Sequence, residues 1–203
     1  MADYRAIMVL CEAVLDLLQA NYSPADFNHN ELQFKVFLAK DFSQSMKAGV
    51  SLFLYRIYPN GIHRAPSGRF NMDGRRFRTQ LPLDLHFLLT AWAQDASLQH
   101  TIAGWMMRVL EDTPILPAGL LNRKFPSAFH PDETVEISLT ELTTEEMCRI
   151  WEVIVKDHTY QISVPYVARA VKIESKKLLP TIAAIQERRF EIGEPETLQT
   201  GQS

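Results

Sequence analysis

Two side chains capable of acid–base chemistry, Asp84 and His86, stand two residues apart in the segment LPLDLHFLLTAW, residues 81–92. Alternate residues of a β-strand point to the same face, so a strand here would place the carboxylate beside the imidazole. A carboxylate that orients a histidine base is typical of many hydrolases. No nucleophile or third group is spaced to join the pair, so a cross-strand hydrogen bond or simple solvation is the simpler interpretation.

Motifs for other catalytic or metal chemistry are missing from the sequence. It contains no phosphate-binding loop, dinucleotide-binding glycine pattern, nucleophile elbow, HExxH motif or CxxC pair. The six histidines are scattered without the His-x-His or His-x3-His spacing of a zinc site. We therefore expect no enzymatic activity, no cofactor and no metal.

Aromatic residues form a third group with binding potential. Trp92, Trp105 and Trp151, together with Phe53 and Phe87, have the ring surfaces from which a ligand pocket could be built. Two of the tryptophans recur at the spacing of a buried helix face, so we interpret the group as core.

The segment 59–79 is rich in arginine and has a local charge of +4, from five arginines and one aspartate. The arginines are Arg64, Arg69, Arg75, Arg76 and Arg78. Guanidinium groups could bind phosphates, with Phe70 and Phe77 stacking on bases, or could pair with carboxylates of a protein partner. The whole chain has a net charge of -3, so it lacks the broad basic face of a nucleic-acid-binding domain. A merely solvated loop is a third interpretation.

The segment that carries Asp84 changes from a period of two residues to a period of 3.6. Leu83, Leu85, Phe87, Leu89 and Ala91 fall on one face, while Pro82, Asp84, His86, Thr90 and Trp92 mark the other, which predicts a half-buried strand. A helix is predicted next, with Asp95 and Ser97 as candidate N-caps and its end before Pro114. Its apolar stripe consists of Leu98, Ile102, Trp105, Met106, Val109 and Leu110.

The remaining periodicities complete the predicted elements. They indicate helices over 3–20 and from the capping box Thr143–Glu146, with Met147, Ile150, Trp151, Ile154 and Val155 buried, and strands over 32–38, 50–58, 134–139 and 160–173. A phase change near Pro165 predicts a bulge or an edge position. We expect a long mobile loop over 59–79 and an irregular connection over 113–132.

The order of these elements predicts an α+β fold, a mixed or antiparallel sheet flanked by helices. The expected core includes Leu85, Phe87, Leu89, Ile102, Trp105, Ile150, Trp151 and Ile162. The length of 203 residues, 46% of them hydrophobic, favours one domain over 1–174 and a C-terminal extension over 175–203, partly disordered or docked on a partner. Four apolar residues of that extension lack enough chain to bury them: Leu178, Leu179, Ile182 and Ile185.

Cysteine usage and the N-terminus bear on the compartment. Cys11 and Cys148 lie among apolar residues on predicted helices, so we expect both to be buried, reduced thiols. Charged residues from Asp3 to Asp16 interrupt any signal-peptide core, and no run approaches the ~20 apolar residues of a membrane span. These features predict synthesis in the cytoplasm without a signal peptide.

Five blocks of the sequence resemble, in order and at compatible spacings, the tail-terminator or cap proteins of phage-tail-like contractile injection systems. The blocks are SLFLYRIYPNGIHR (51–64), LPLDLHFLLTAWA (81–93), IAGWMMRVLEDTPIL (102–116), VEISLTELTTEEMCRIW (135–151) and YQISVPYVARAVKIE (160–174). The resemblance extends from about Ala6 to Glu174. It implies a fold like that of phage tail-terminator proteins, a sheet flanked by helices.

The same resemblance implies a structural role: a homohexameric ring that ends polymerisation at the distal end of an inner tube and its contractile sheath. The implied partners are the sheath protein and the tube protein, in a particle either released or anchored. Strand exchange with the sheath would involve Val171, Ile173 and the tail after them. Two alternatives remain open, a nucleic-acid-binding adaptor that uses segment 59–79 and a small hydrolase around Asp84 and His86.

Overall fold

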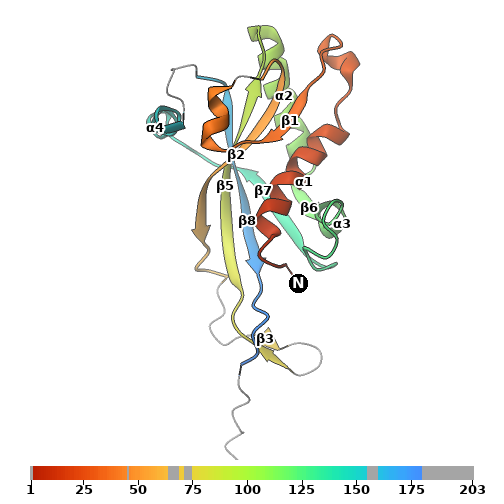
Figure 1. Cartoon of the computed structure of the whole chain (residues 1–203), viewed down its shortest axis with the longest axis vertical. Coiled ribbons are helices and arrows are strands. Elements are labelled where there is room, and N and C mark those ends of the chain that lie inside the picture. Colours follow the sequence, from red (N-terminus) through yellow and green to blue (C-terminus); the bar gives the residue numbers. More distant parts are fainter. Residues whose placement is uncertain (1, 45, 64–68, 71–74, 155–159, 180–203) are drawn as a thin grey trace, which may run out of the picture.

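The computed structural model describes residues 2–44, 46–63, 69–70, 75–154 and 160–179. They form a six-stranded sheet with helices on both faces and a separate two-stranded sheet at its lower end (Figure 1). The strands of the large sheet, in spatial order, are β1 (Gln33–Val36), β2 (Gly49–Pro59), β5 (Leu81–Trp92), β8 (Ser163–Ile173), β7 (Thr134–Leu139) and β6 (Ile115–Pro117). β1 runs parallel to β2 and all other neighbours are antiparallel. This mixed sheet confirms the predicted α+β fold.

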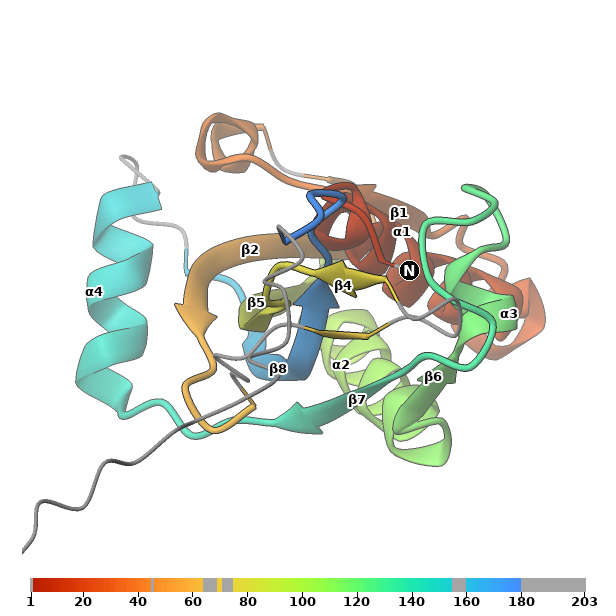
Figure 2. The same cartoon turned by 90° about the horizontal axis from the view of Figure 1, so that it is seen from below.

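The helices divide between the two faces of the sheet. The α-helices are α1 (Ala6–Ala20), α2 (Ala96–Asp112), α3 (Ala118–Leu121) and α4 (Thr144–Ile154), and the 3-10 helices are η1 (Pro24–Phe27) and η2 (Ala39–Ser43). α1 packs on β1, β2 and β8, and α2 packs on β5, while α4 contacts η2. Figure 2 shows α4 on the opposite side of the curled sheet from α1 and α3.

Two buried clusters hold these layers together. The larger includes the odd-numbered residues Leu85, Phe87 and Leu89 of β5 beneath Ile102 of α2. The smaller, on the other face, consists of Phe37, Phe42, Met46, Trp92, Trp151 and Ile154. Of the predicted core, Trp105, Ile150 and Ile162 are only partly buried and pack against these clusters, and the other five residues are buried. Val155 lies outside the described residues.

The prediction of a half-buried central strand is right for only the first half of β5. Asp84 and His86 are partly exposed, as expected, but Leu88, Thr90 and Trp92 on the same face are buried. Thr90 shares a hydrogen bond with Ser163 Oγ (2.8 Å), and Trp92 Nε1 donates to Ser51 Oγ (2.8 Å). Polar side chains can be buried here because their hydrogen bonds are made within the sheet.

The helix starts follow their sequence signals. Asp95 caps α2 by accepting from Leu98 N at 2.9 Å. α4 begins with the predicted capping box, in which Thr143 Oγ1 accepts from Glu146 N (3.2 Å) and Glu146 accepts from Thr143 N (2.9 Å). This hydrogen bond lowers the pKa of Glu146.

Two predicted irregular segments contain regular structure. Within 59–79, β3 (Arg69–Phe70) and β4 (Arg76–Phe77) form an antiparallel pair, so the expected loop contains two short strands. The connection 113–132 contains β6 and α3, where Ile115 to Pro117 pair with β7. Both were missed because two- and three-residue strands are too short to show a period.

The predicted bulge in the last strand is present, at a different place. β8 lies between β5 and β7, and Arg169 and Ala170 together face Asp84. Ala170 has a φ of 52°, in the left-handed region that residues with a side chain seldom adopt. The phase change near Pro165 has another cause: both faces of β8 are covered there, so Tyr166, Val167 and Ala168 are all buried.

Within the described ranges, none of the helices has the length and apolar character needed to cross a membrane.

Burial of Trp151 is predicted to dominate the stability of the smaller cluster. Its ring is 5% exposed and packs edge-on against Phe42 and Tyr160, both at 5.4 Å between centroids. Trp151→Ala should lower the free energy of unfolding by about 3–5 kcal/mol. Val153→Ala on the same helix, where the side chain is 82% exposed, should change it by less than about 0.5 kcal/mol. Urea unfolding measures both, and equal midpoints for the two variants would contradict this packing.

The two cysteines are predicted to differ in reactivity. Cys11 is buried, and burial raises the pKa of its thiol to about 12. Cys148 is exposed on α4, which corrects the expectation that both are buried. Because an alkylating reagent needs an accessible thiolate, native protein should be modified at Cys148 and unfolded protein at both. Peptide mass spectrometry reads this out, and rapid labelling of Cys11 in native protein would contradict the placement of α1.

Candidate functional site

Asp84 and His86 do share a face of β5, as predicted, but the carboxylate serves the backbone. Asp84 Oδ1 accepts from Ala170 N at 2.8 Å, and Asn60 Nδ2 donates to both carboxylate oxygens at 3.0 and 3.1 Å. His86 packs beside the Tyr55 ring, and burial together with the positive charge of Arg56 lowers its pKa. The geometry supports the cross-strand hydrogen-bond interpretation of Asp84.

Asp84 stabilises one of two bulges that flank β5, one opposite Asp84 and the other between His86 and Phe87. On one side Tyr55 is the extra residue of β2, and on the other Arg169 and Ala170 face Asp84 from β8. Bulges bend a strand and increase its twist. Beyond them the end of β2 becomes exposed, with Ile57 and Tyr58 45% and 50% exposed, while Leu83 of β5 and Val171 of β8 stay buried. The lower ends of the long strands therefore leave the helices and lead toward β3 and β4 (Figure 1).

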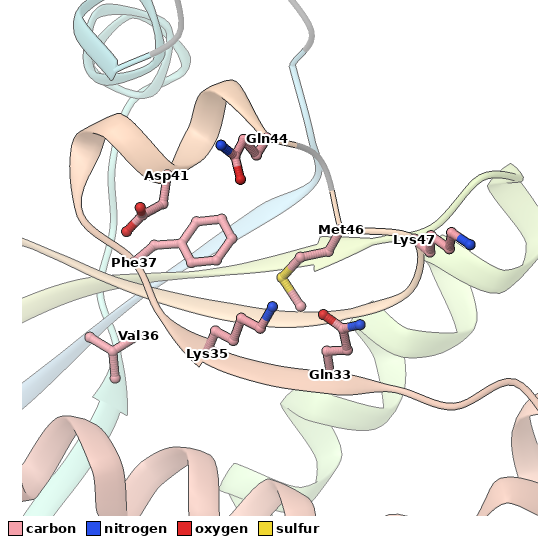
Figure 3. Close-up of a pocket in the computed structure, with 8 residues that line it drawn as sticks. All are labelled: Gln33, Lys35, Val36, Phe37, Asp41, Gln44, Met46 and Lys47. Atoms are coloured by element: carbon pink, nitrogen blue, oxygen red, sulfur yellow. The ribbon is translucent and has the colours of Figure 1, made fainter.

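A hollow of about 480 Å³ lies along β1, at the other end of the sheet. It is lined by Gln33, Lys35, Val36, Phe37, Asp41, Gln44, Met46 and Lys47. Figure 3 shows Gln33, Lys35 and Met46 directed into the same space, with Val36 pointing away from it. Asp41 already accepts from Leu38 N at 2.7 Å. The hollow is open and mainly polar, so it lacks the enclosed apolar walls of a typical small-molecule site.

Basic residues gather instead at the lower end of the molecule, in a unit we call the basic tip: residues 69–70, 75–79 and 176–179. Residues 177–179 extend the hairpin as a third segment, since Arg78 N donates to Lys177 O (3.0 Å) and Leu179 N to Arg76 O (2.8 Å). Phe77 and Leu178 form the bridge between these hydrogen bonds. The basic tip has six cationic residues and no carboxylate. The arginine-rich hairpin and residues 176–179, which are far apart in the sequence, thus form one strongly positive unit.

The pairing in the basic tip sets like charges against each other. Arg78 and Lys177, the residues next to the Phe77–Leu178 bridge, are joined by the hydrogen bond from Arg78 N to Lys177 O, so two cationic residues are neighbours across the pairing. Both are exposed. Neighbouring like charges repel, so this arrangement favours binding of an anionic partner over stability of the isolated chain.

The structure places the predicted interaction residues in different surroundings. Arg69, Arg75, Arg76, Arg78, Leu178 and Leu179 all belong to the basic tip, whereas Arg64, Ile182 and Ile185 lie outside the described residues. Val171 is buried in the larger cluster, and Ile173 packs partly buried against it. Lys176 and Lys177 were overlooked as members of the site. Their signal was present, two lysines directly after the last strand, but its meaning depends on the pairing with β4.

Comparison with protein families identifies the chain. Residues 10–187 match the family described as the Pvc16 N-terminal domain. The chain belongs to this family. A comparison with curated protein sequences found no match.

Two solved structures share the fold of this Pvc16 N-terminal domain. One is the PVC sheath/tube terminator of an extracellular contractile injection system in the extended state, with 15% identity and a TM-score of 0.62 over 95% of this chain and 65% of that chain. The other is the tube-terminating cap of the anti-feeding prophage, with 13% identity and a TM-score of 0.59 over 89% of this chain and 59% of that chain. The chain therefore spans less than two thirds of either relative. The expected fold of a tail terminator is confirmed.

Loss of the Asp84 carboxylate is predicted to loosen the lower end of the sheet. Asp84→Ala would leave the partly buried Ala170 N–H and the Asn60 amide without this acceptor, at a cost of about 1–3 kcal/mol in unfolding free energy. Asp84→Asn retains an oxygen for Ala170 and should cost less. Urea unfolding gives the energies, and trypsin should cleave the basic tip faster in the alanine variant. If Asp84→Ala matched its parent in both measurements, the carboxylate would not support the bulge.

Proposed function

We propose that this chain is a terminator cap of a contractile injection system. It would form a homohexameric ring at the distal end of the inner tube and sheath and stop further subunit addition. The observation that carries the proposal is the match of 95% of the chain to a sheath/tube terminator, together with family membership over residues 10–187. Its partners would be the sheath protein, the tube protein and further copies of itself in a phage-tail-like particle.

The site geometry supports a structural role and no catalysis. A terminator needs surfaces that bind partners, and the chain carries a charged unit extending from a rigid sheet (Figure 1). The hydrolase alternative loses support because Asp84 is engaged with the backbone of Ala170 and with Asn60. The nucleic-acid alternative rests on the basic tip alone, and the remainder of the chain is acidic.

The tail has two parts in this proposal. Residues 176–179 belong to the basic tip, and Leu178 is 53% exposed there, available to a partner. Residues 180–203, with Ile182 and Ile185, lie outside the described residues, and their proposed role is contact with the sheath. The division between a domain over 1–174 and an extension over 175–203 is part of the proposal. The start of the extension is not separate from the domain, because residues 177–179 are hydrogen bonded to β4 and the residue after it.

Truncation of the tail is predicted to broaden the length distribution of the particles. Polymer addition continues until something occupies the terminal interface, so a cap with a weaker hold should give long and variable tubes and sheaths. One variant should end after Glu174 and another after Leu179, which separates the basic tip from the residues beyond it. Electron microscopy measures the lengths, with a complete deletion of the gene as the reference for an uncapped particle.

Both truncated proteins should remain folded, because the buried clusters lie within residues 2–171. Circular dichroism and thermal melting check this. Lengths as narrow as the parent's, with the truncated cap still on the particle, would assign the contact to the body of the domain. Lengths unchanged even by gene deletion would refute the proposed function itself.

A further inference from the structure

The charges of this chain are separated into two surfaces on different parts of the molecule. One is the basic tip. The other, which we call the acidic flank, is residues 132–154, with seven carboxylates and one arginine, Arg149. It includes β7 and α4, which follow one another along one side of the molecule in Figure 2. The flank has a charge of -6 and the residues of the basic tip one of +6, so the two surfaces are opposite in charge.

We propose that the basic tip of one copy docks on the acidic flank of a second copy. This inference rests on the proposed ring and names the contact that would close it. Within one copy the two surfaces cannot meet at α4, because Figure 1 places α4 near the upper part of the molecule and β3 at the lower end. A contact between two different surfaces is heterologous, and repeated around a rotation axis it closes a ring.

The acidic flank is accessible for such a contact. Glu136, Glu141, Glu145 and Glu152 are exposed, and only Glu145 is paired within the flank, with Arg149. Apolar area is exposed beside these carboxylates: Val153 is 82% and Leu139 is 46% exposed. The basic tip has Leu178, 53% exposed, next to Lys177. An interface with charge complementarity and some exposed apolar area on both sides fits these surfaces.

The like-charge pair in the basic tip points to the same partner. Arg78 and Lys177 repel each other in the isolated chain, and carboxylates inserted beside them would remove that repulsion. A compact carboxylate surface touches only the basic tip. A nucleic acid extends well beyond it and would meet the repulsion of the flank, so the protein partner is the favoured occupant.

A charge swap tests the contact. The tip variant R75E/R78E and the flank variant E141K/E152K each reverse two exposed charges, and the control K35E/K40E reverses two lysines near β1. Glu141 and Glu152 are chosen because Glu145 is paired with Arg149, and Glu136 faces Arg169 across β7 and β8. Sedimentation equilibrium at low and physiological salt gives the mass and the self-association constant of each protein. Thermal melting shows whether each variant is folded.

The tip variant and the flank variant should each self-associate roughly tenfold or more weakly than the parent, with the loss greatest at low salt. The control should match the parent, and the four-fold variant that combines both reversals should regain association. R78E alone turns the Arg78–Lys177 repulsion into attraction, so it should melt no lower than the parent while associating more weakly.

Three results would overturn the inference. They are a monomeric parent at low salt, a tip variant that associates like its parent, and a combined variant that fails to recover while both single reversals are folded and impaired. Retention of the parent on duplex DNA at physiological salt, lost in R75E/R78E without any change in mass, would instead assign the basic tip to nucleic acid. Particle lengths judge the cap function independently, so the ring contact can fail while that function stands.

Discussion

The lower half of the molecule depends on the hydrogen bond from Ala170 N to the carboxylate of Asp84. Ala170 adopts a left-handed backbone conformation, which is unfavourable for a residue with a side chain, and Asp84 binds its N–H across the bulge. Tyr55 forms a matching bulge on the other side of β5. The two bulges bend β2 and β8, the strands on either side of β5, just before the exposed end of β2. Asp84, a candidate member of a catalytic pair in the sequence, therefore stabilises the part of the sheet that leads to the basic tip.

Buried apolar residues stabilise the fold, and the charged residues lie on separate, exposed surfaces. The two clusters pack against opposite faces of the sheet and hold its strands in place. The charged side chains lie on surfaces that face away from those clusters, since residues 176–178 and the outer side of α4 are exposed, while Trp151 and Ile154 on the inner side of α4 belong to the smaller cluster. A surface can carry unbalanced charge without unfolding its domain when that domain is stabilised elsewhere. This separation is what a protein with a binding role and a rigid frame requires.

Periodicity predicted the long elements well, because a run of twelve residues such as β5 shows its alternation clearly and Asp95 and Thr143 provide recognisable helix caps. It failed where the decisive contact was nonlocal. The burial of Thr90 and Trp92 depends on α4 and η2 covering a second face, and the exposure of Cys148 depends on which side of α4 meets Phe42. The arginines were recognised as binding residues from their number. Their union with Lys176 and Lys177 required the hydrogen bonds between β4 and the segment after β8, which no local pattern encodes.

The position of β8 determines the order in which the chain can fold. β8 is inserted between β5 and β7, although both are made before it, so the centre of the sheet stays open until β8 emerges from the ribosome. The N-terminus also reaches its final position late, since Ala2 is buried and its carbonyl accepts from Glu174 N. Contacts between residues so far apart in sequence slow folding and leave strand edges unpaired during synthesis. The nascent chain would therefore be prone to aggregation for most of its translation, and chaperone binding to the unpaired edges of β5 and β7 would be useful until β8 has emerged from the ribosome.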